Sequence, residues 1–212
     1  PNVKAYRFYF VQLIIKYMNF IKGISKFILF LIAVYVFSAF FAKSNYNVER
    51  TRVMSASQKL IYTQIGILKN WENWSPWKER DPLVKFSYEG KDASNGAMMY
   101  WKGGEHTSGS GSIEIVQADP PYSMVYKLSL LESFAMSSKG SFILSAESSE
   151  RTQVRWTNHG ELPFLLRPLM MFMDMDKEMG PDFERGLFKI DSICSNLEGQ
   201  IQTIMQRDSL KN

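Results

Sequence analysis

Hydrophobic residues near the C-terminus repeat at alternating steps of four and three, the spacing of one face of an α-helix. The residues of this apolar stripe are Phe183, Leu187, Ile190, Cys194, Leu197, Ile201 and Ile204. Pro181 suits the first turn of a helix, where its missing N–H needs no partner, so the pattern predicts a helix over residues 181–207. At about 1.5 Å per residue this helix is roughly 40 Å long, and its stripe needs a broad surface to cover it.

The middle of the chain carries short runs in which apolar and polar residues alternate, as in strands with one buried face. The pattern predicts a first strand over 46–53, a helix that ends near residue 70, and then six more strands. Those six strands are expected over 84–88, 97–101, 111–116, 123–130, 139–146 and 152–157. This order of elements predicts an antiparallel sheet that covers the long C-terminal helix.

Two segments between the last strand and the long helix are interpreted as connections. Asn158-His159-Gly160 has the composition of a turn. Residues 163–179 are apolar and rich in methionine, and Gly180-Pro181 after them predicts a break in regular structure. We therefore expect the last strand to end near residue 157 and the long helix to begin at Pro181.

An uncharged apolar run over residues 27–42 lies near the N-terminus, and the two residues before Lys26 extend it to nearly the length of a membrane span. The run predicts a transmembrane helix over 24–43. Residues 1–23 are then a cytoplasmic or interfacial segment, and residues 44–210 are the folded domain.

A cleavable signal peptide is the alternative to an uncleaved anchor. The candidate cleavage sites place Phe37 or Phe40 at a position that needs a small residue, which favours the anchor. Lys22 and Lys26 precede the span, and basic residues favour the cytoplasmic side. The sequence therefore predicts a single-pass membrane protein with a cytoplasmic N-terminus and its domain outside the cytoplasm.

The positive net charge of the chain belongs to its N-terminal part. Residues 1–43 carry 6 basic residues and no acidic one, which leaves 19 of the 25 basic residues against all 21 acidic residues. A slightly acidic domain lacks the basic face that binding to a phosphate backbone requires. We therefore expect no nucleic-acid partner.

Short motifs in the domain occur in a characteristic order. They are Asn70-Trp71, Trp74-Ser75-Pro76-Trp77, Asp81-Pro82, Tyr88-Glu89-Gly90, Trp101-Lys102-Gly103, Gly109-Ser110-Gly111, Thr152–Trp156 and Asp182–Leu187. With these motifs, residues 43–200 resemble membrane-anchored bacterial members of the START-like superfamily, also called SRPBCC or polyketide cyclase/lipid transport proteins. The resemblance implies an α+β helix-grip fold: a seven-stranded antiparallel sheet wraps around a long C-terminal helix and encloses a hydrophobic cavity. It implies no catalytic residues, because members differ in ligand and many have no known activity.

The candidate ligand-binding residues are the aromatic, aliphatic and methionine side chains expected around that cavity. Tryptophans at 71–77 either stack on a ligand or cap the core and fix a loop. The methionines of 170–179 either adapt to varied apolar ligands or pack in the core. The predicted contacts are Trp71, Trp74, Trp77, Tyr100, Trp101, Phe142, Trp156, Phe164, Leu169, Met170, Met173, Phe183 and Leu187.

Metal and thiol chemistry find little support in the sequence. Neither His106 nor His159 has a second histidine or a cysteine at metal-ligand spacing, so we predict no metal site. Cys194 is the only cysteine and lies on the apolar stripe, which is typical of a small buried hydrophobic residue. No motif predicts a cofactor.

The sequence therefore predicts a membrane-tethered domain that binds a hydrophobic small molecule or lipid and performs no catalysis. One alternative is an enzyme of the polyketide cyclase/hydrolase type, with Tyr100, His159 or Glu161 as acid or base. It requires a polar group with a shifted pKa inside the cavity. A second alternative is a solid-cored interaction domain that binds no ligand.

Overall fold

The computed structural model describes residues 3–103, 109–131 and 136–209, and the chain divides into two compact units. One unit contains the N-terminal segment through Lys43 together with residues 164–172. The other unit contains residues 44–163 and the chain from Met173 onward. Residues 164–172 therefore pack with the N-terminal segment. The sequence pattern instead predicts that they belong to the folded domain.

The N-terminal unit is built on one long helix, α1 (Val3–Ala39). Its segment Phe8–Ala39 is long and apolar enough to cross a membrane, and its most apolar stretch is not buried. The helix contains most of the predicted span and continues back through residues 3–23. No proline interrupts it there. A candidate transmembrane helix is therefore present, and it is longer than the sequence analysis expects.

The short 3-10 helix η2 (Phe164–Met171) packs against α1. The ring of Phe164 meets the ring of Phe40 edge-on, with centroids 4.9 Å apart. The hydroxyl of Tyr35 donates to the backbone carbonyl of Leu165 at 2.5 Å. These contacts explain why part of the methionine-rich segment belongs to the N-terminal unit.

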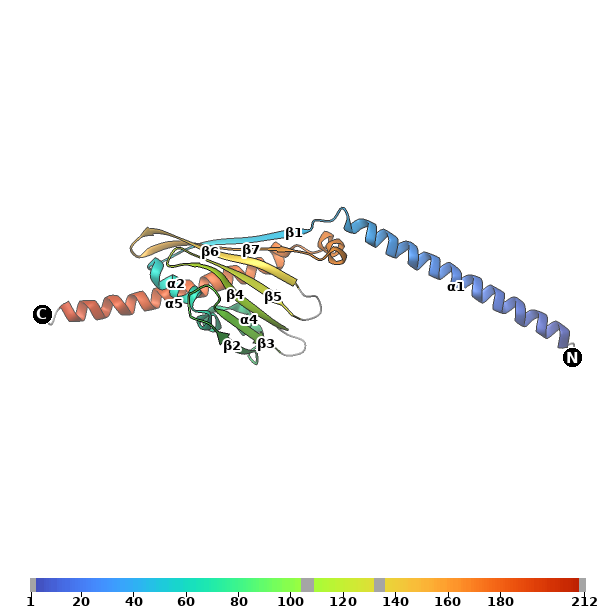
Figure 1. Ribbon diagram of the computed structural model, residues 1–212, viewed down its shortest axis with the longest axis horizontal. Coiled ribbons are helices and arrows are strands. Elements are labelled where there is room, and N and C mark those ends of the chain that lie inside the picture. Colours follow the sequence, from blue (N-terminus) through green and yellow to red (C-terminus); the bar gives the residue numbers. More distant parts are fainter. Residues whose placement is uncertain (1–2, 104–108, 132–135, 210–212) are drawn as a thin grey trace. The chain divides into compact units, whose positions relative to one another are not determined.

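The second unit contains a seven-stranded antiparallel sheet (Figure 1). Its strands lie in the order β1-β7-β6-β5-β4-β3-β2. The bounds are β1 (Asn45–Met54), β2 (Lys85–Glu89), β3 (Met98–Lys102), β4 (Ser110–Asp119), β5 (Ser123–Leu130), β6 (Met136–Ser148) and β7 (Arg151–Glu161). Every predicted strand is present, and each predicted range overlaps an observed one.

Helical segments join β1 to β2 and follow the sheet. They are α2 (Gln58–Gly66), the 3-10 helix η1 (Leu68–Asn70), α3 (Trp71–Trp74), α4 (Pro76–Arg80) and the long α5 (Met175–Ser209). The prediction of an α+β helix-grip fold with a long C-terminal helix is confirmed (Figure 1).

The hydrophobic core lies between α5, the α2–α4 connection and one face of the sheet. Phe183 of α5 stacks on Trp156 of β7, with ring centroids 4.0 Å apart and planes 2° from parallel. The apolar stripe is buried from Phe183 to Cys194, but Ile201 and Ile204 are 44% and 57% exposed. Helix α5 runs on past the sheet, so only part of its stripe is covered (Figure 1).

The side chain of Cys194 lies fully buried in this core. Burial raises the pKa of its thiol to about 12, so the thiol stays protonated at neutral pH. The prediction of a small buried hydrophobic residue at this position is confirmed.

The predicted start of the long helix at Pro181 is wrong, because α5 begins at Met175. Asp174 caps the helix: its Oδ1 accepts the N–H of Asp176 at 3.1 Å, and its carbonyl accepts the N–H of Glu178 at 3.0 Å. Pro181 lies inside the helix, where it removes one backbone hydrogen bond without ending the helix.

The predicted turn over Asn158-His159-Gly160 is also wrong, because these residues lie within β7. His159 pairs with Asn47 of β1 on one side and with Lys139 of β6 on the other. The buried amide of Asn158 donates to the hydroxyl of Ser138 at 3.2 Å. Pairing along both edges of the strand overrides the turn propensity of this tripeptide.

Candidate functional site

A partly enclosed cavity of about 440 Å³ lies in the second unit, beside the first turns of α5. Its walls come from α3 and α4, from strands β2, β3 and β5, and from α5. The lining residues are Trp71, Ser75, Trp77, Arg80, Val84, Phe86, Met99, Trp101, Leu128, Leu130 and Met179. Nine of these eleven are apolar, and the volume lies within the roughly 300–1,000 Å³ of small-molecule sites.

Local sequence places two tryptophans in the cavity wall. Ser75 caps α4, because its Oγ accepts the N–H of Trp77 at 3.3 Å, and Pro76 occupies the first helical position. The indole N–H of Trp71 donates to the carbonyl of Ile65 at 2.8 Å. The rings of Trp71 and Trp77 stack with centroids 6.4 Å apart. The serine–proline pair therefore sets the turn that brings both indoles to one wall.

Strand β3 forms the facing wall of the cavity, because every second side chain of the strand points to that side of the sheet. Met99 and Trp101 line the cavity, whereas Tyr100 between them points to the other face of the sheet, since successive side chains on a strand alternate. The hydroxyl of Tyr100 lies 3.1 Å from the sulfur of Met98. The ring of Trp101 packs over Gly111, its register partner on β4.

The structure separates the predicted ligand-binding residues into two groups within the second unit. Trp71, Trp77 and Trp101 line the cavity. The packed core holds Trp74, Phe142, Trp156, Phe183 and Leu187. Their rings and side chains contact one another, and ligand contact by this second group stays a prediction.

Three other predicted contacts, Phe164, Leu169 and Met173, are not among the residues that line this cavity. Phe164 and Leu169 belong to η2 in the N-terminal unit, and the side chain of Met170 lies outside the described part of the structure. Met173 lies between η2 and α5 and is about half exposed. For these residues too, ligand contact stays a prediction.

The residues named for the enzyme alternative do not line the cavity. His159 and Glu161 lie along an open groove of about 470 Å³, together with Lys127 and Lys139. His106 lies outside the described residues. In the described part of the chain, no group of three His, Cys, Asp or Glu residues is placed to hold a metal ion.

The sequence patterns do not single out most residues of the cavity wall, including the one charged residue among those that the structure describes there. The missed residues are Ser75, Arg80, Val84, Phe86, Met99, Leu128, Leu130 and Met179. Alternation supplied a signal for some of them, because Met99 shares a face with Trp101, and Leu128 shares a face with Leu130. No pattern in the sequence distinguishes Arg80 from other surface arginines.

The cavity lies at one end of α5 and not along the whole helix. Between α5 and the sheet, the ring of Trp156 packs directly against the ring of Phe183. Trp156 also contacts Phe142 and Trp74, at centroid distances of 4.8 and 5.6 Å. Met179 is the one α5 residue among those that line the cavity. Bulky aromatic rings thus close the space that the sequence analysis expects to be open under the helix.

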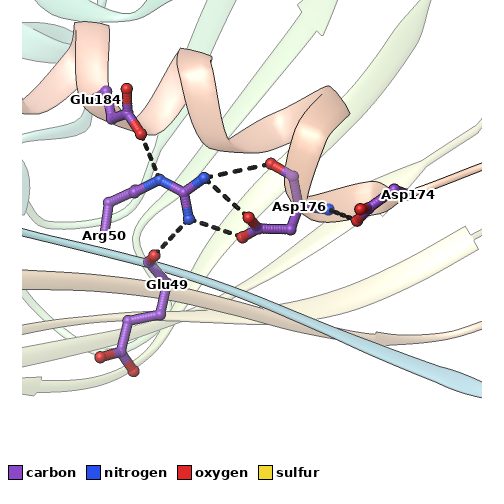
Figure 2. Close-up of polar contacts among 5 residues, drawn as sticks. All are labelled: Glu49, Arg50, Asp174, Asp176 and Glu184. Atoms are coloured by element: carbon purple, nitrogen blue, oxygen red, sulfur yellow. Dashed lines mark hydrogen bonds and ion pairs between the residues drawn. The ribbon is translucent and has the colours of Figure 1, made fainter.

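Arg50 of β1 holds the first turns of α5 (Figure 2). Its Nη1 lies 2.7 Å from Oδ1 of Asp176, and its Nε lies 2.6 Å from Oε1 of Glu184. A Cβ at Gly180 would lie 2.6 Å from the Arg50 Cζ, so a larger residue there would displace this guanidinium from its present position. Because Asp176 precedes Pro181 and Glu184 follows it, Arg50 bridges both sides of the proline.

The same arginine sets the charge state of its partner. The hydrogen bond from Arg50 holds the pKa of the Asp176 carboxyl below its usual value. The carboxylate therefore stays ionised, and the ion pair persists at neutral pH. These ion pairs of Arg50 hold the first turns of α5 in place, and Met179 in those turns lines the cavity.

A second group of charges holds α4 against α5. Glu79 of α4 accepts a hydrogen bond from Arg185 at 2.5 Å and also pairs with Lys189. These hydrogen bonds lower the pKa of Glu79 from its ordinary 4.5 to about 2. The cavity wall formed by α4 is therefore tied to the long helix by exposed ion pairs.

Glu79→Gln is expected to make the unfolding free energy of the domain less sensitive to acid. A carboxyl group with a depressed pKa stabilises the folded state above its unfolded pKa, and that contribution is lost as pH falls through the folded pKa. The difference between wild type and Glu79→Gln should therefore shrink as pH falls from about 4.5 to about 2. Urea unfolding followed by tryptophan fluorescence measures this difference.

The matched control is Glu147→Gln, which removes an exposed carboxylate paired with Arg151. It removes one exposed ion pair that does not join α4 to α5, and so controls for the loss of a carboxylate alone. A difference between wild type and Glu79→Gln that stays constant across that interval would contradict the expected linkage.

No family model matches the chain, and no curated protein matches it. Solved structures do share its architecture. The di-domain ARO/CYC protein StfQ of the steffimycin biosynthetic pathway is 14% identical, with a TM-score of 0.56, over 74% of this chain and 53% of its own. Norcoclaurine synthase from Thalictrum flavum, in complex with dopamine and hydroxybenzaldehyde, is 9% identical, with a TM-score of 0.53, over 72% of this chain and 88% of its own.

Major latex-like protein 151 from Panax ginseng is 12% identical, with a TM-score of 0.52, over 72% of this chain and 99% of its own. Together with the strand order and the long C-terminal helix, these matches decide the architecture. The domain has the helix-grip fold of SRPBCC, or START-like, proteins. At such low identity the likeness concerns the fold of the helix-grip domain, and the fold implied by the sequence motifs is confirmed.

Proposed function

We propose that this protein is a membrane-tethered helix-grip domain that binds a hydrophobic small molecule or lipid. The observation that carries the proposal is the cavity of about 440 Å³ with nine apolar residues among its eleven lining residues. Burial of apolar ligand surface there contributes about 25 cal/mol per Å², before the costs of association. The indoles of Trp71, Trp77 and Trp101 provide broad contact area for such a ligand.

The N-terminal helix supports the tether. Its segment Phe8–Ala39 has the length and composition of a membrane span. Lys22 and Lys26 favour a cytoplasmic N-terminus, with the domain outside the cytoplasm. A tethered domain meets membrane lipids at a high effective concentration, so even modest intrinsic affinity suffices for occupancy.

Two neighbours of the same fold favour a small-molecule role. Norcoclaurine synthase was crystallised with dopamine and hydroxybenzaldehyde, and StfQ is named as an ARO/CYC protein of a biosynthetic pathway. For catalysis, the cavity itself offers little, because Tyr100, His159 and Glu161 lie elsewhere. Binding without chemistry is therefore the function that the site supports best.

Leu128→Trp tests the proposal by filling the cavity. An indole in place of the isobutyl group of Leu128 occupies ligand space, so apolar ligand binding should fall at least tenfold. Native mass spectrometry of the full chain, released from membranes without added lipid, measures the occupied fraction. Wild type is expected to carry an apolar ligand, and Leu128→Trp is expected to be empty.

The control is Leu131→Trp, which adds the same ring at an exposed position outside the cavity. It should retain the occupancy of wild type. An empty wild-type protein that also fails to bind added apolar compounds would overturn the proposal. Equal occupancy of wild type and Leu128→Trp would overturn the choice of this cavity.

A further inference from the structure

We infer that the cavity selects ligands with one apolar chain and a negatively charged end group, and that Arg80 binds this end group. The inference rests on the proposed function and names the class of ligand for the same cavity. It depends on the charge of the lining, on the position of Arg80, and on the hydrogen-bonding capacity that Arg80 retains.

The described part of the cavity lining has one charged residue. Among the described residues that line the cavity, Arg80 is the only ionised side chain and Ser75 the only other polar one. The Ser75 oxygen already accepts the N–H of Trp77. No carboxylate is among the described residues of the lining. Over this part of its wall, a ligand therefore meets apolar surface together with the hydroxyl of Ser75 and one cation, Arg80.

Arg80 is one of the exposed residues of the cavity lining. Its side chain is 59% exposed, whereas Trp71 at the opposite extreme is 1% exposed. A ligand that buries its apolar chain against Trp71 and Met99 therefore brings its other end toward the guanidinium. Such an end group stays hydrated in part, which lowers the cost of placing a charge there.

The position of Arg80 is set before any ligand arrives. It is the last residue of α4, which is capped by Ser75 and tied to α5 through Glu79. Its Nη2 contacts the carboxylate of Asp182, a side chain that is only 13% exposed. A guanidinium with a fixed direction loses little conformational freedom when it binds an anion.

Asp182 does not use up the hydrogen-bonding capacity of Arg80. A guanidinium presents five N–H donors, and Asp182 is its one partner within the described part of the chain. The remaining donors match the paired oxygens of a carboxylate.

End groups are therefore ranked by their charge. A carboxylate gains charge-assisted hydrogen bonds from Arg80, whereas a hydroxyl gains a weaker neutral–ion contact. An ammonium group at the same place is repelled by Arg80. For one apolar chain, the expected order of affinity is acid, then alcohol, then amine.

The experiment uses the full chain in phosphatidylcholine nanodiscs and three probes: dodecanoic acid, dodecanol and dodecylamine, each with bromine at the chain end. Bromine quenches the fluorescence of tryptophans in the cavity, and protein-free nanodiscs give the partition of each probe into lipid. The acid is expected to bind about tenfold more tightly than the alcohol, a difference of about 1.4 kcal/mol. In Arg80→Gln, the affinity for the acid should fall to that for the alcohol, which stays unchanged.

The matched control is Arg151→Gln, since Arg151 is similarly exposed and paired with a carboxylate, on the β6–β7 hairpin. It should keep the tenfold preference of wild type. If Arg80→Gln does not fold, Arg80→Lys keeps the charge and should retain a reduced preference for the acid.

The outcomes separate the two proposals. If no probe quenches beyond the level of protein-free nanodiscs, the proposed function fails. If all three probes bind equally, or the amine binds best, the hydrophobic site stands and the inference about charge is overturned. An acid preference that survives in Arg80→Gln would also overturn it, because another cation would then hold the end group.

Discussion

Trp156→Ala is expected to lower the free energy of unfolding by about 3–5 kcal/mol, the usual cost of truncating a buried aromatic residue. The indole is fully buried, stacks on Phe183 at 4.0 Å and on Phe142 at 4.8 Å, and donates to the hydroxyl of Tyr126 at 2.8 Å. Its removal leaves a cavity where α5 meets the sheet and leaves the buried Tyr126 hydroxyl without this donor.

Cys194 provides the measurement for this variant. It is the only cysteine of the chain and is buried, so its labelling by a thiol reagent in increasing urea reports global unfolding of the full chain. The signal is independent of tryptophan fluorescence and of the surrounding lipid. The urea midpoint for labelling should fall markedly in Trp156→Ala.

Two controls separate stacking from hydrogen bonding in the effect of Trp156→Ala. Trp156→Phe keeps a ring against Phe183 but loses the bond to Tyr126, so it should cost about 1–3 kcal/mol. Phe188→Ala removes a ring from a half-exposed position on the same helix and should cost less. A cost for Trp156→Ala no larger than that for Phe188→Ala would show that the stack does not hold α5 to the sheet.

Gly111→Ala is expected to destabilise the domain by about 1–3 kcal/mol and to reshape the cavity, as overpacked sites do. A Cβ at this position would overlap the ring of Trp101 and lie 2.6 Å from the backbone oxygen of Ser129. The ring can move, but the strand backbone of β5 cannot move without disturbing the ladder. Labelling of Cys194 in urea measures the loss of stability, and a shifted tryptophan emission maximum reports the displacement of Trp101.

The control for Gly111→Ala is Gly199→Ala, because a Cβ on Gly199 in α5 meets no atom within 4 Å. That change should stabilise the helix by roughly 0.5–1 kcal/mol, since alanine loses less conformational entropy than glycine. If both alanine variants shift stability in the same direction, the tight contact at Gly111 is not the cause.

The cavity wall could be predicted only in part. Trp71, Trp77 and Trp101 were found because large aromatic residues in a loop and on a strand are conspicuous in a sequence. Trp156 and Phe183 are equally conspicuous, yet they stack on each other in the core. Whether a ring faces another ring or an open space depends on the distance between α5 and the sheet. That distance is set by the packing of all the side chains between α5 and the sheet, so no single residue type predicts it.

Local propensity predicts the wrong structure at two places for one physical reason. Pro181 and the tripeptide Asn158-His159-Gly160 carry breaker and turn composition, but distant residues hold them in regular structure. Arg50 bonds to carboxylates on both sides of the proline, and β1 and β6 pair with both edges of β7. Neither partner is near in sequence, so no local pattern contains it.

The sequence by itself determined the seven strands, the long C-terminal helix and the apolar N-terminal helix. Each follows from a period of two or 3.6 residues, or from an unbroken apolar run, and such signals arise within one segment. Only the tertiary structure decided that the cavity lies at one end of α5 and that Arg80 is the single charge among the described residues of its lining. Both facts depend on which residues of α4, β3, β5 and α5 come together around the cavity. Packing between these segments decides this, and no single segment contains that information.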